Sequence, residues 1–242
     1  MPASNWVKPA FLTSDHVSLV PLEPSHAPAL AKAACTLATF RFFSRAPIDP
    51  ARAADAVNWD EPVTEAAMRA FIDFLLGPAM TVPFCVMARQ EDSTDSRAAS
   101  PASSSLTAHE TSVRDAPLTP VGITTYLDIK DAHRGLEIGW TWYAPACRGS
   151  ASRFGPVNPA CKLLLMRHAF ESLGAIRVCL KTDERNARSR AAIERLGGRL
   201  EGLLRATMIM PDGHRRTTAM YSILDSEWPE ARARLEARLA RA

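Results

Sequence analysis

The chain has few cysteines, little net charge and no long hydrophobic run. Its five cysteines are odd in number and form no Cys-x-x-Cys pair, which argues against a disulfide framework or a zinc site and favours a reducing, cytoplasmic setting. A net charge of +3 argues against extensive nucleic-acid binding. No apolar run approaches the ~20 residues of a membrane helix, and residues 1–11 lack the apolar core of a signal peptide. We therefore expect no nucleic acid, membrane or metal as a partner.

What the chain does have is enough apolar material for a substantial core. Hydrophobic residues make up 47% of the 242 residues, and charged residues make up 23%. This length fits one domain with insertions or two small domains. Residues 90–119 bear on that choice, because they are rich in Ser, Thr, Ala and Asp and almost free of large apolar side chains. We interpret them as a flexible insertion within one domain spanning 1–242; a linker between two domains is the alternative.

Apolar periodicity and turn signals predict strands that alternate with helices. Strands are expected at 17–22, 82–88, 121–129, 136–143 and 176–180, with a hairpin formed by 200–210 and 217–224. Helices are expected from Ser25 as N-cap to about Thr36, at 65–76, from Asn158 as N-cap to about Leu173, before Gly197-Gly198, and at 226–240. The strand at 136–143, the following helix and the strand at 176–180 form a βαβ unit, so these two strands should be parallel. The expected fold class is therefore α/β with a mixed sheet.

Two strand–loop–helix units stand out in the second half of the chain. The first passes through Arg148-Gly149 into the helix at Asn158-Pro159, and the second passes from Lys181 to Ser189 into the helix closed by Gly197-Gly198. Such units build a cleft with backbone N–H groups at its mouth, which suits a phosphate-bearing cofactor. The run Lys-Thr-Asp-x-x-Asn-x-x-Ser from Lys181 to Ser189 resembles the GNAT superfamily of acyl-CoA-dependent N-acetyltransferases, and within it the RimJ/RimL-like group.

The resemblance implies a GNAT-like central sheet that is mostly antiparallel and flanked by helices. Its one parallel strand pair would splay apart at the cofactor cleft. The implied co-substrate is acetyl-CoA, and the implied reaction is direct transfer of the acetyl group to a primary amine, either a protein or peptide N-terminus or a small molecule. Three departures leave a non-catalytic acyl-CoA-binding regulatory module as the alternative, and one of them is a lengthened loop between Arg148 and Asn158. Ile193 stands where many members carry a proton-donating Tyr, and Arg216-Thr217-Thr218 stands where relatives carry Arg-Asp-Thr.

The resemblance also implies where the cofactor binds. Its phosphates are expected at the loop and helix start that contain Arg148, Gly149, Gly155, Val157 and Asn158. Glycine lets the backbone approach an anion, and a helix N-terminus attracts negative charge. The loop is longer than in the family pattern, and Pro156 has no N–H. A plain surface loop is therefore the alternative.

Aromatic and polar side chains would continue the cofactor channel. Trp142 and Tyr143 are expected to line it, although strand aromatics also serve as core residues. Asn186 is expected to contact the pantetheine arm or the substrate, and Ser189 to lie near the sulfur. The alternative is that Asn186 caps the following helix and that Ser189 belongs to its first turn.

Acetyl transfer needs a base that leaves the acceptor amine neutral. Glu137, on the strand at 136–143, is the candidate, because the resemblance places a base on this strand in several members. A structural glutamate paired with Lys130 or Arg134 is the alternative, and His133 in the preceding turn is the second candidate base.

The remaining basic residues carry weaker signals. We interpret Lys162, Arg167 and Lys181 as solvated charges and Arg215-Arg216 as a surface pair. Contact with an acidic substrate is the alternative for Arg215-Arg216. The final helix at 226–240 is expected either to cover the sheet or to form a homodimer contact.

Overall fold

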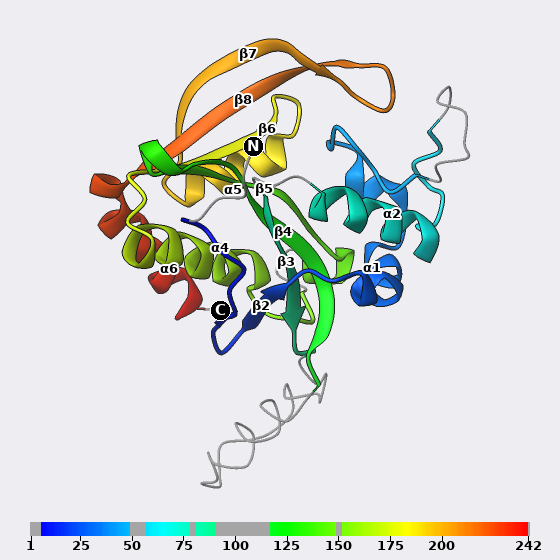
Figure 1. Cartoon of the computed structure of the whole chain (residues 1–242), viewed down its shortest axis with the longest axis horizontal. Helices are drawn as coiled ribbons and strands as arrows, with labels where there is room; N and C mark the ends of the chain where they lie inside the picture. The colour runs from blue at the N-terminus through cyan, green and yellow to red at the C-terminus, as the bar shows by residue number, and fades with distance from the viewer. Residues whose placement is uncertain (1–5, 49–56, 78–80, 91–116, 149–151, 242) are drawn as a thin grey trace, which may run out of the picture.

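One eight-stranded sheet organises the protein (Figure 1). The computed structural model describes residues 6–48, 57–77, 81–90, 117–148 and 152–241. The strands are β1 Leu12–Thr13, β2 Val17–Pro21, β3 Val82–Ala88, β4 Thr119–Lys130, β5 Gly135–Tyr143, β6 Arg177–Asp183, β7 Arg199–Ile209 and β8 Arg215–Leu224. They lie in the order β1-β2-β3-β4-β5-β6-β8-β7, and β5 and β6 are parallel while the other described pairs are antiparallel. The expected fold class is confirmed.

Helices cover both faces of this sheet. They are α1 Ala27–Ala34, α2 Glu65–Leu76, α4 Val157–Arg167, α5 Ala187–Arg195 and α6 Trp228–Leu239. Figure 1 shows α1 and α2 on one face and α4 and α6 on the other, and each face has its own apolar core. The final helix packs on α4, where Trp228 stacks on Phe170 with ring centroids 5.3 Å apart. None of the helices in the described ranges is long and apolar enough to cross a membrane.

Two of the expected helix starts are wrong. A 3₁₀ turn at Pro24–His26 precedes α1, so Ser25 lies in that turn and does not cap the helix. The second case is α4, which begins at Val157, so Asn158 lies in its first turn. Gly155, with a φ of 63°, turns the chain there, and Val157 anchors the helix start because its side chain is buried in the core. Burial therefore sets this boundary, and the cap preference of Asn does not.

The ends of the expected insertion lie side by side. Ala88 and Thr119 are directly opposed on β3 and β4, and the Thr119 hydroxyl donates to the Ala88 carbonyl at 3.3 Å. Residues 91–116, which form most of the expected insertion, lie outside the described residues. A short connection could therefore join the two strands without moving either one.

Replacing residues 91–116 with a short Gly/Ser linker is expected to leave folding and activity nearly unchanged. Loop length enters closure entropy weakly, so the free energy of unfolding should change by less than about 2 kcal/mol. Urea denaturation and kcat/KM measure the two effects, and a Gly/Ser linker of the original length is the control for sequence. A large loss of rate in both variants would show that this segment acts as a lid or a substrate arm.

Candidate active site

The site lies where the two parallel strands separate. β5 and β6 pair only at Gly135–Arg177, Leu136–Val178 and Glu137–Cys179, although β5 continues to Tyr143 and β6 to Asp183. Each strand keeps its other neighbour, because β5 stays paired with β4 and β6 stays paired with β8. From Ile138 onward this edge of β5 has no neighbouring strand among the described residues, so its N–H and C=O groups can pair with a ligand. The expected splay of the parallel pair is confirmed.

A β-bulge shapes β5 beside this gap. Opposite Gly139 and Trp142 lie Thr125 and Ile123, so Trp140 and Thr141 together face the single residue Thr124. Trp140 has a φ of 47°, the left-handed region that a bulky residue rarely adopts. The bulge turns the Trp140 ring to α2, where it packs edge-on against Phe71 at 6.0 Å. It turns the Thr141 hydroxyl toward α4.

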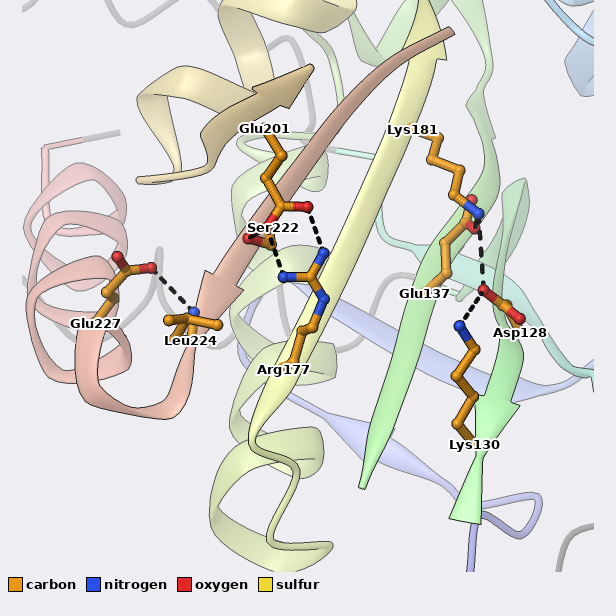
Figure 2. Close-up of polar contacts among 9 residues, drawn as sticks. All are labelled: Asp128, Lys130, Glu137, Arg177, Lys181, Glu201, Ser222, Leu224 and Glu227. Carbon is orange, nitrogen blue, oxygen red and sulfur yellow. Dashed lines mark hydrogen bonds and ion pairs between the residues drawn. The ribbon is translucent and has the colours of Figure 1, made fainter. Parts of the chain in front are cut away.

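Glu137 lies at the point where the strands part. Its side chain is 8% exposed, and Oε2 lies 2.6 Å from Nζ of Lys181 on β6. Figure 2 shows these two side chains pointing toward one another from neighbouring strands, with Asp128 beside Lys181 and Lys130. Burial raises the pKa of the Glu137 carboxyl above its ordinary value, although the contact with Lys181 acts in the opposite direction. A carboxylate with a raised pKa is better matched to taking a proton near neutral pH.

Gly139 leaves room for this carboxylate. A Cβ at this position would lie 2.9 Å from Oε1 of Glu137 and 3.0 Å from Cδ2 of Leu127. Oε2 is held by Lys181, and Oε1 lies over the backbone of Gly139, toward the bulge. The structural alternative for Glu137, pairing with Lys130 or Arg134, has the wrong partners. Lys130 pairs with Asp128, and Glu137 pairs with Lys181. Lys181 is accordingly not a free solvated charge.

The two aromatic residues after the bulge point to opposite faces of the sheet. Trp142 is 3% exposed and packs edge-on against Phe40 in the α1–α2 core, with centroids 5.1 Å apart. Tyr143 packs against the α4 core, and its hydroxyl lies beside Cys161. Both rings are core residues, so the part of this segment that borders the gap is its backbone. A contact between either ring and the cofactor remains a prediction.

Two arginines bring positive charge to the far end of the gap, Arg148 after the end of β5 and Arg188 in the first turn of α5. Arg148 donates to the carbonyl of Tyr143 from Nη2 at 2.9 Å and from Nε at 3.2 Å. Burial lowers the pKa of Arg148, and the charge of Arg188 on the first turn of α5 lowers it further. Two positive charges that act on one another in this way favour an anion in their neighbourhood. Arg188 was missed in the sequence, although it lies within the run that carries the family resemblance.

The start of α4 offers less to a phosphate than its sequence suggested. Pro156 and Pro159 have no N–H, and the N–H of Val157 donates to Gly155 at 3.0 Å. The backbone donor that remains in this first turn belongs to Asn158. Gly149 lies outside the described residues. The arginine pair is therefore the stronger anion feature among the residues that the structure describes.

Asn186 caps α5. Its side-chain oxygen accepts the backbone N–H of Ser189 at 3.1 Å, which is the structural alternative considered for it. The cap places Asn186, Ser189 and Arg188 together in the first turn of a helix that follows β6. Both Asn186 and Ser189 are half-buried. Their contacts with a cofactor remain predictions.

Two buried charges were misread in the sequence. Lys162 on α4 is 5% exposed, and its Nζ donates to Oγ1 of Thr141 at 3.1 Å. Arg216 is 8% exposed, while its neighbour Arg215 is exposed as expected. Neither Lys162 nor Arg216 is a solvated charge. A signal for Lys162 was present, because apolar residues on every helical face surround it from Ala160 to Met166.

The fold and the gap define an α/β protein with a mixed sheet whose parallel strand pair, β5 and β6, separates partway along its length. A family model described as an acetyltransferase (GNAT) domain matches residues 16–199. The chain belongs to this family of acetyltransferases. The recognition of a GNAT acetyltransferase from the segment between Lys181 and Ser189 is thereby confirmed.

Similar proteins agree with this assignment. YdaF of Bacillus subtilis (strain 168), named as a ribosomal N-acetyltransferase, is 32% identical over 107 residues, which cover 44% of this chain and 55% of that relative. The match thus spans about half the length of this curated relative. A structure from T. thermophilus described as an acetyltransferase is 34% identical, covers 97% of this chain and 99% of that chain, and has a TM-score of 0.72. Mycobacterium smegmatis RimJ in complex with CoA-disulfide, 22% identical, shares the fold over 98% of this chain and 97% of that chain with a TM-score of 0.61. The expected RimJ/RimL-like group is supported.

Proposed function

We propose that the protein is an acetyl-CoA-dependent N-acetyltransferase that moves the acetyl group directly to a primary amine. The observation that carries this proposal is the buried carboxylate of Glu137 at the point where β5 and β6 part. Acetyl-CoA supplies the acetyl group as a thioester. The gap edge of β5 would hold its extended arm, and Arg148, Arg188 and the first turn of α5 would hold its phosphates.

Glu137 serves as the base in this proposal. An acceptor amine must lose a proton to act as a nucleophile, and an N-terminal amine has a pKa of about 8, so a modest base is sufficient. The raised pKa of Glu137 and the position of Oε1 beside Gly139 support this role. Lys181 fixes the other oxygen and keeps the carboxylate in place.

Direct transfer is favoured over an acyl-enzyme because four of the five cysteines are poorly suited as nucleophiles and the fifth, Cys35, lies outside the gap, after α1. Burial raises the pKa of Cys85, Cys147 and Cys161 to about 12. It also raises the pKa of Cys179. A thiol reacts as its thiolate, so these side chains stay protonated and inert near neutral pH. The unpaired cysteines also support the proposed cytoplasmic setting.

A protein or peptide N-terminus is the first acceptor class that we propose, and a small-molecule amine is the second. The curated relative is named for ribosomal N-acetylation, which supports the first class. The alternative function is a non-catalytic acyl-CoA-binding module. Release of free thiol from acetyl-CoA with a panel of peptides and amines separates the two functions, since a module binds acetyl-CoA but releases none. A homodimer remains a prediction.

Acetyl-CoA is expected to raise the melting temperature of the protein. Ligand binding to the folded state adds about 2.7 kcal/mol of stability at a hundredfold excess over Kd. Arg188→Gln should weaken this effect, because it removes one of the two positive charges at the far end of the gap. Arg148→Ala is less specific, since Arg148 also holds the end of β5. Arg195→Gln, on the exposed last turn of the same helix, is the matched control. Equal melting curves with and without acetyl-CoA would contradict the cofactor assignment.

A further inference from the structure

In the described part of the structure, a buried ammonium lies beneath the gap without a counter-ion. Lys162 is 5% exposed, and in the described part of the chain its Nζ has one hydrogen-bond partner, Oγ1 of Thr141, and forms no ion pair. An ammonium has three N–H donors, so two are left without a protein acceptor. Burying a charge in this way is costly unless something else compensates for it.

Thr141 connects this lysine to the site. Its hydroxyl also lies 2.9 Å from Oγ1 of Thr124 and 3.3 Å from the carbonyl of Gly139. Thr141 belongs to the bulge in β5, next to the edge that has no neighbouring strand. Lys162 is therefore aimed from α4 at the segment where the gap opens, on the face opposite Glu137.

The surroundings of Lys162 bring the pKa of its ammonium close to that of a thiol. Burial lowers its pKa to about 8, while Cys161 on the same helix and Glu137 on β5 act in the opposite direction. The Tyr143 hydroxyl lies next to Cys161, and its pKa lies well above the ordinary value because it is buried. A group with a pKa of about 8 can exchange a proton with a thiol, whose ordinary pKa is about 8.5.

The residues on α5 cannot fill this role well. Ile193 is apolar and buried in the core, and the Ser189 hydroxyl is a poor acid. We propose that Lys162 stabilises and protonates the CoA thiolate that leaves when the acetyl group is transferred. This inference rests on the proposed function and assigns the general acid of that reaction.

The residues of the site account for each proton and for the electron pair that move in this step. The amine nitrogen forms a bond to the acetyl carbon, the carbon–sulfur bond breaks, and its electron pair goes to sulfur. The acceptor enters this step as the neutral amine, after its ammonium form has passed one proton through Glu137 to water. Glu137 then takes the proton that the nitrogen loses as the amide forms, and Lys162 gives a proton to the sulfur. The products are an amide and the CoA thiol. Return of one proton from Glu137 to Lys162 through water restores both groups.

The pKa of the bound CoA thiol tests this inference directly. The thiolate absorbs in the ultraviolet, so its absorbance is titrated with CoA bound to the wild-type protein and to Lys162→Met. A cation within contact distance favours the thiolate, so the bound thiol should titrate about one pKa unit below free CoA in the wild type. Lys162→Met should abolish that shift and lower kcat about tenfold, the rate equivalent of one pKa unit. Lys32→Met, an exposed lysine on α1, removes the same charge as a control.

A second variant covers the chance that Lys162→Met fails to fold. Thr141→Val removes the hydroxyl that aims the ammonium and should reduce the thiol shift in the same direction. An identical thiol pKa in the wild type and in the folded variants overturns this inference alone. If the rate falls while the thiol pKa stays constant, Lys162 acts on another group and the inference is also wrong. A wild-type protein that binds no CoA overturns the proposed function and this inference together.

Discussion

Glu137→Gln is expected to lower kcat/KM by roughly two to four orders of magnitude, the usual contribution of a positioned general base. The amide has nearly the same shape as the carboxylate but cannot accept the proton of the acceptor. Acetyl-CoA affinity should hardly change, because Glu137 lies on the α1–α2 face of the sheet and the proposed phosphate contacts lie at the far end of the gap. Steady-state kinetics and calorimetric titration with acetyl-CoA measure the two effects separately.

The dependence of this loss on pH distinguishes a base from a structural residue. The carboxyl must be deprotonated to act, so wild-type kcat/KM should rise with pH through the raised pKa of Glu137, and the variant should lack this rise. The deficit should then shrink above pH ~8 for an N-terminal amine, where the acceptor is already neutral. Near-normal rates of Glu137→Gln at neutral pH would make Glu137 only the partner of Lys181.

A paired carboxylate elsewhere on the sheet provides the control. Glu201 on β7 binds Arg177 and accepts from the Ser222 hydroxyl at 2.8 Å (Figure 2). Glu201→Gln removes a more exposed ion pair from outside the gap, so kcat/KM should stay within a few-fold of the wild type. Ser189→Ala should give a smaller loss than Glu137→Gln, because water can replace a hydroxyl.

The elements that the sequence predicted well are those whose pattern is local. The helix at 65–76 is confirmed at both ends as α2, since Thr64 accepts the N–H of Ala67 at 3.2 Å and Gly77 follows the last turn. The hairpin of β7 and β8 is confirmed for the same reason, because its apolar runs flank strong turn residues. The start of α4 was missed because the buried side chain of Val157 sets it, and burial depends on the rest of the fold.

The candidate site was predictable in its chain positions and not in its contacts. Glu137 could be chosen from its strand, but its pairing with Lys181 follows from the register that places Glu137 opposite Cys179. Lys162 was misread because charge alone suggests solvent, whereas its neighbours in the fold are Thr141 and the α4 core. Sequence periodicity predicts local helices and strands. It does not predict contacts between residues far apart in sequence, because those depend on the three-dimensional arrangement.

Gly122→Ala should destabilise the fold by about 2–4 kcal/mol, the range of a severe core clash. Gly122 lies on β4 between β3 and β5, and a Cβ there would come within 2.2 Å of the Trp142 carbonyl oxygen and 3.1 Å of Cα of Tyr143. These are backbone atoms, so they cannot rotate away, and β4 and β5 would have to separate. Because Arg148 is anchored on the Tyr143 carbonyl, the phosphate end of the gap should loosen as well.

The midpoint of urea denaturation measures this loss, and a second glycine in the same sheet is the control. Gly202 on β7 has no atom within 4 Å of an added Cβ. Gly202→Ala should therefore shift the free energy of unfolding by no more than about 1 kcal/mol, with either sign. Acetyl-CoA affinity should fall in Gly122→Ala and stay constant in Gly202→Ala. Equal midpoints for the two variants would mean that β4 and β5 can separate near the bulge without loss of stability. They would contradict the claim that close packing at Gly122 holds the edge of the gap in place.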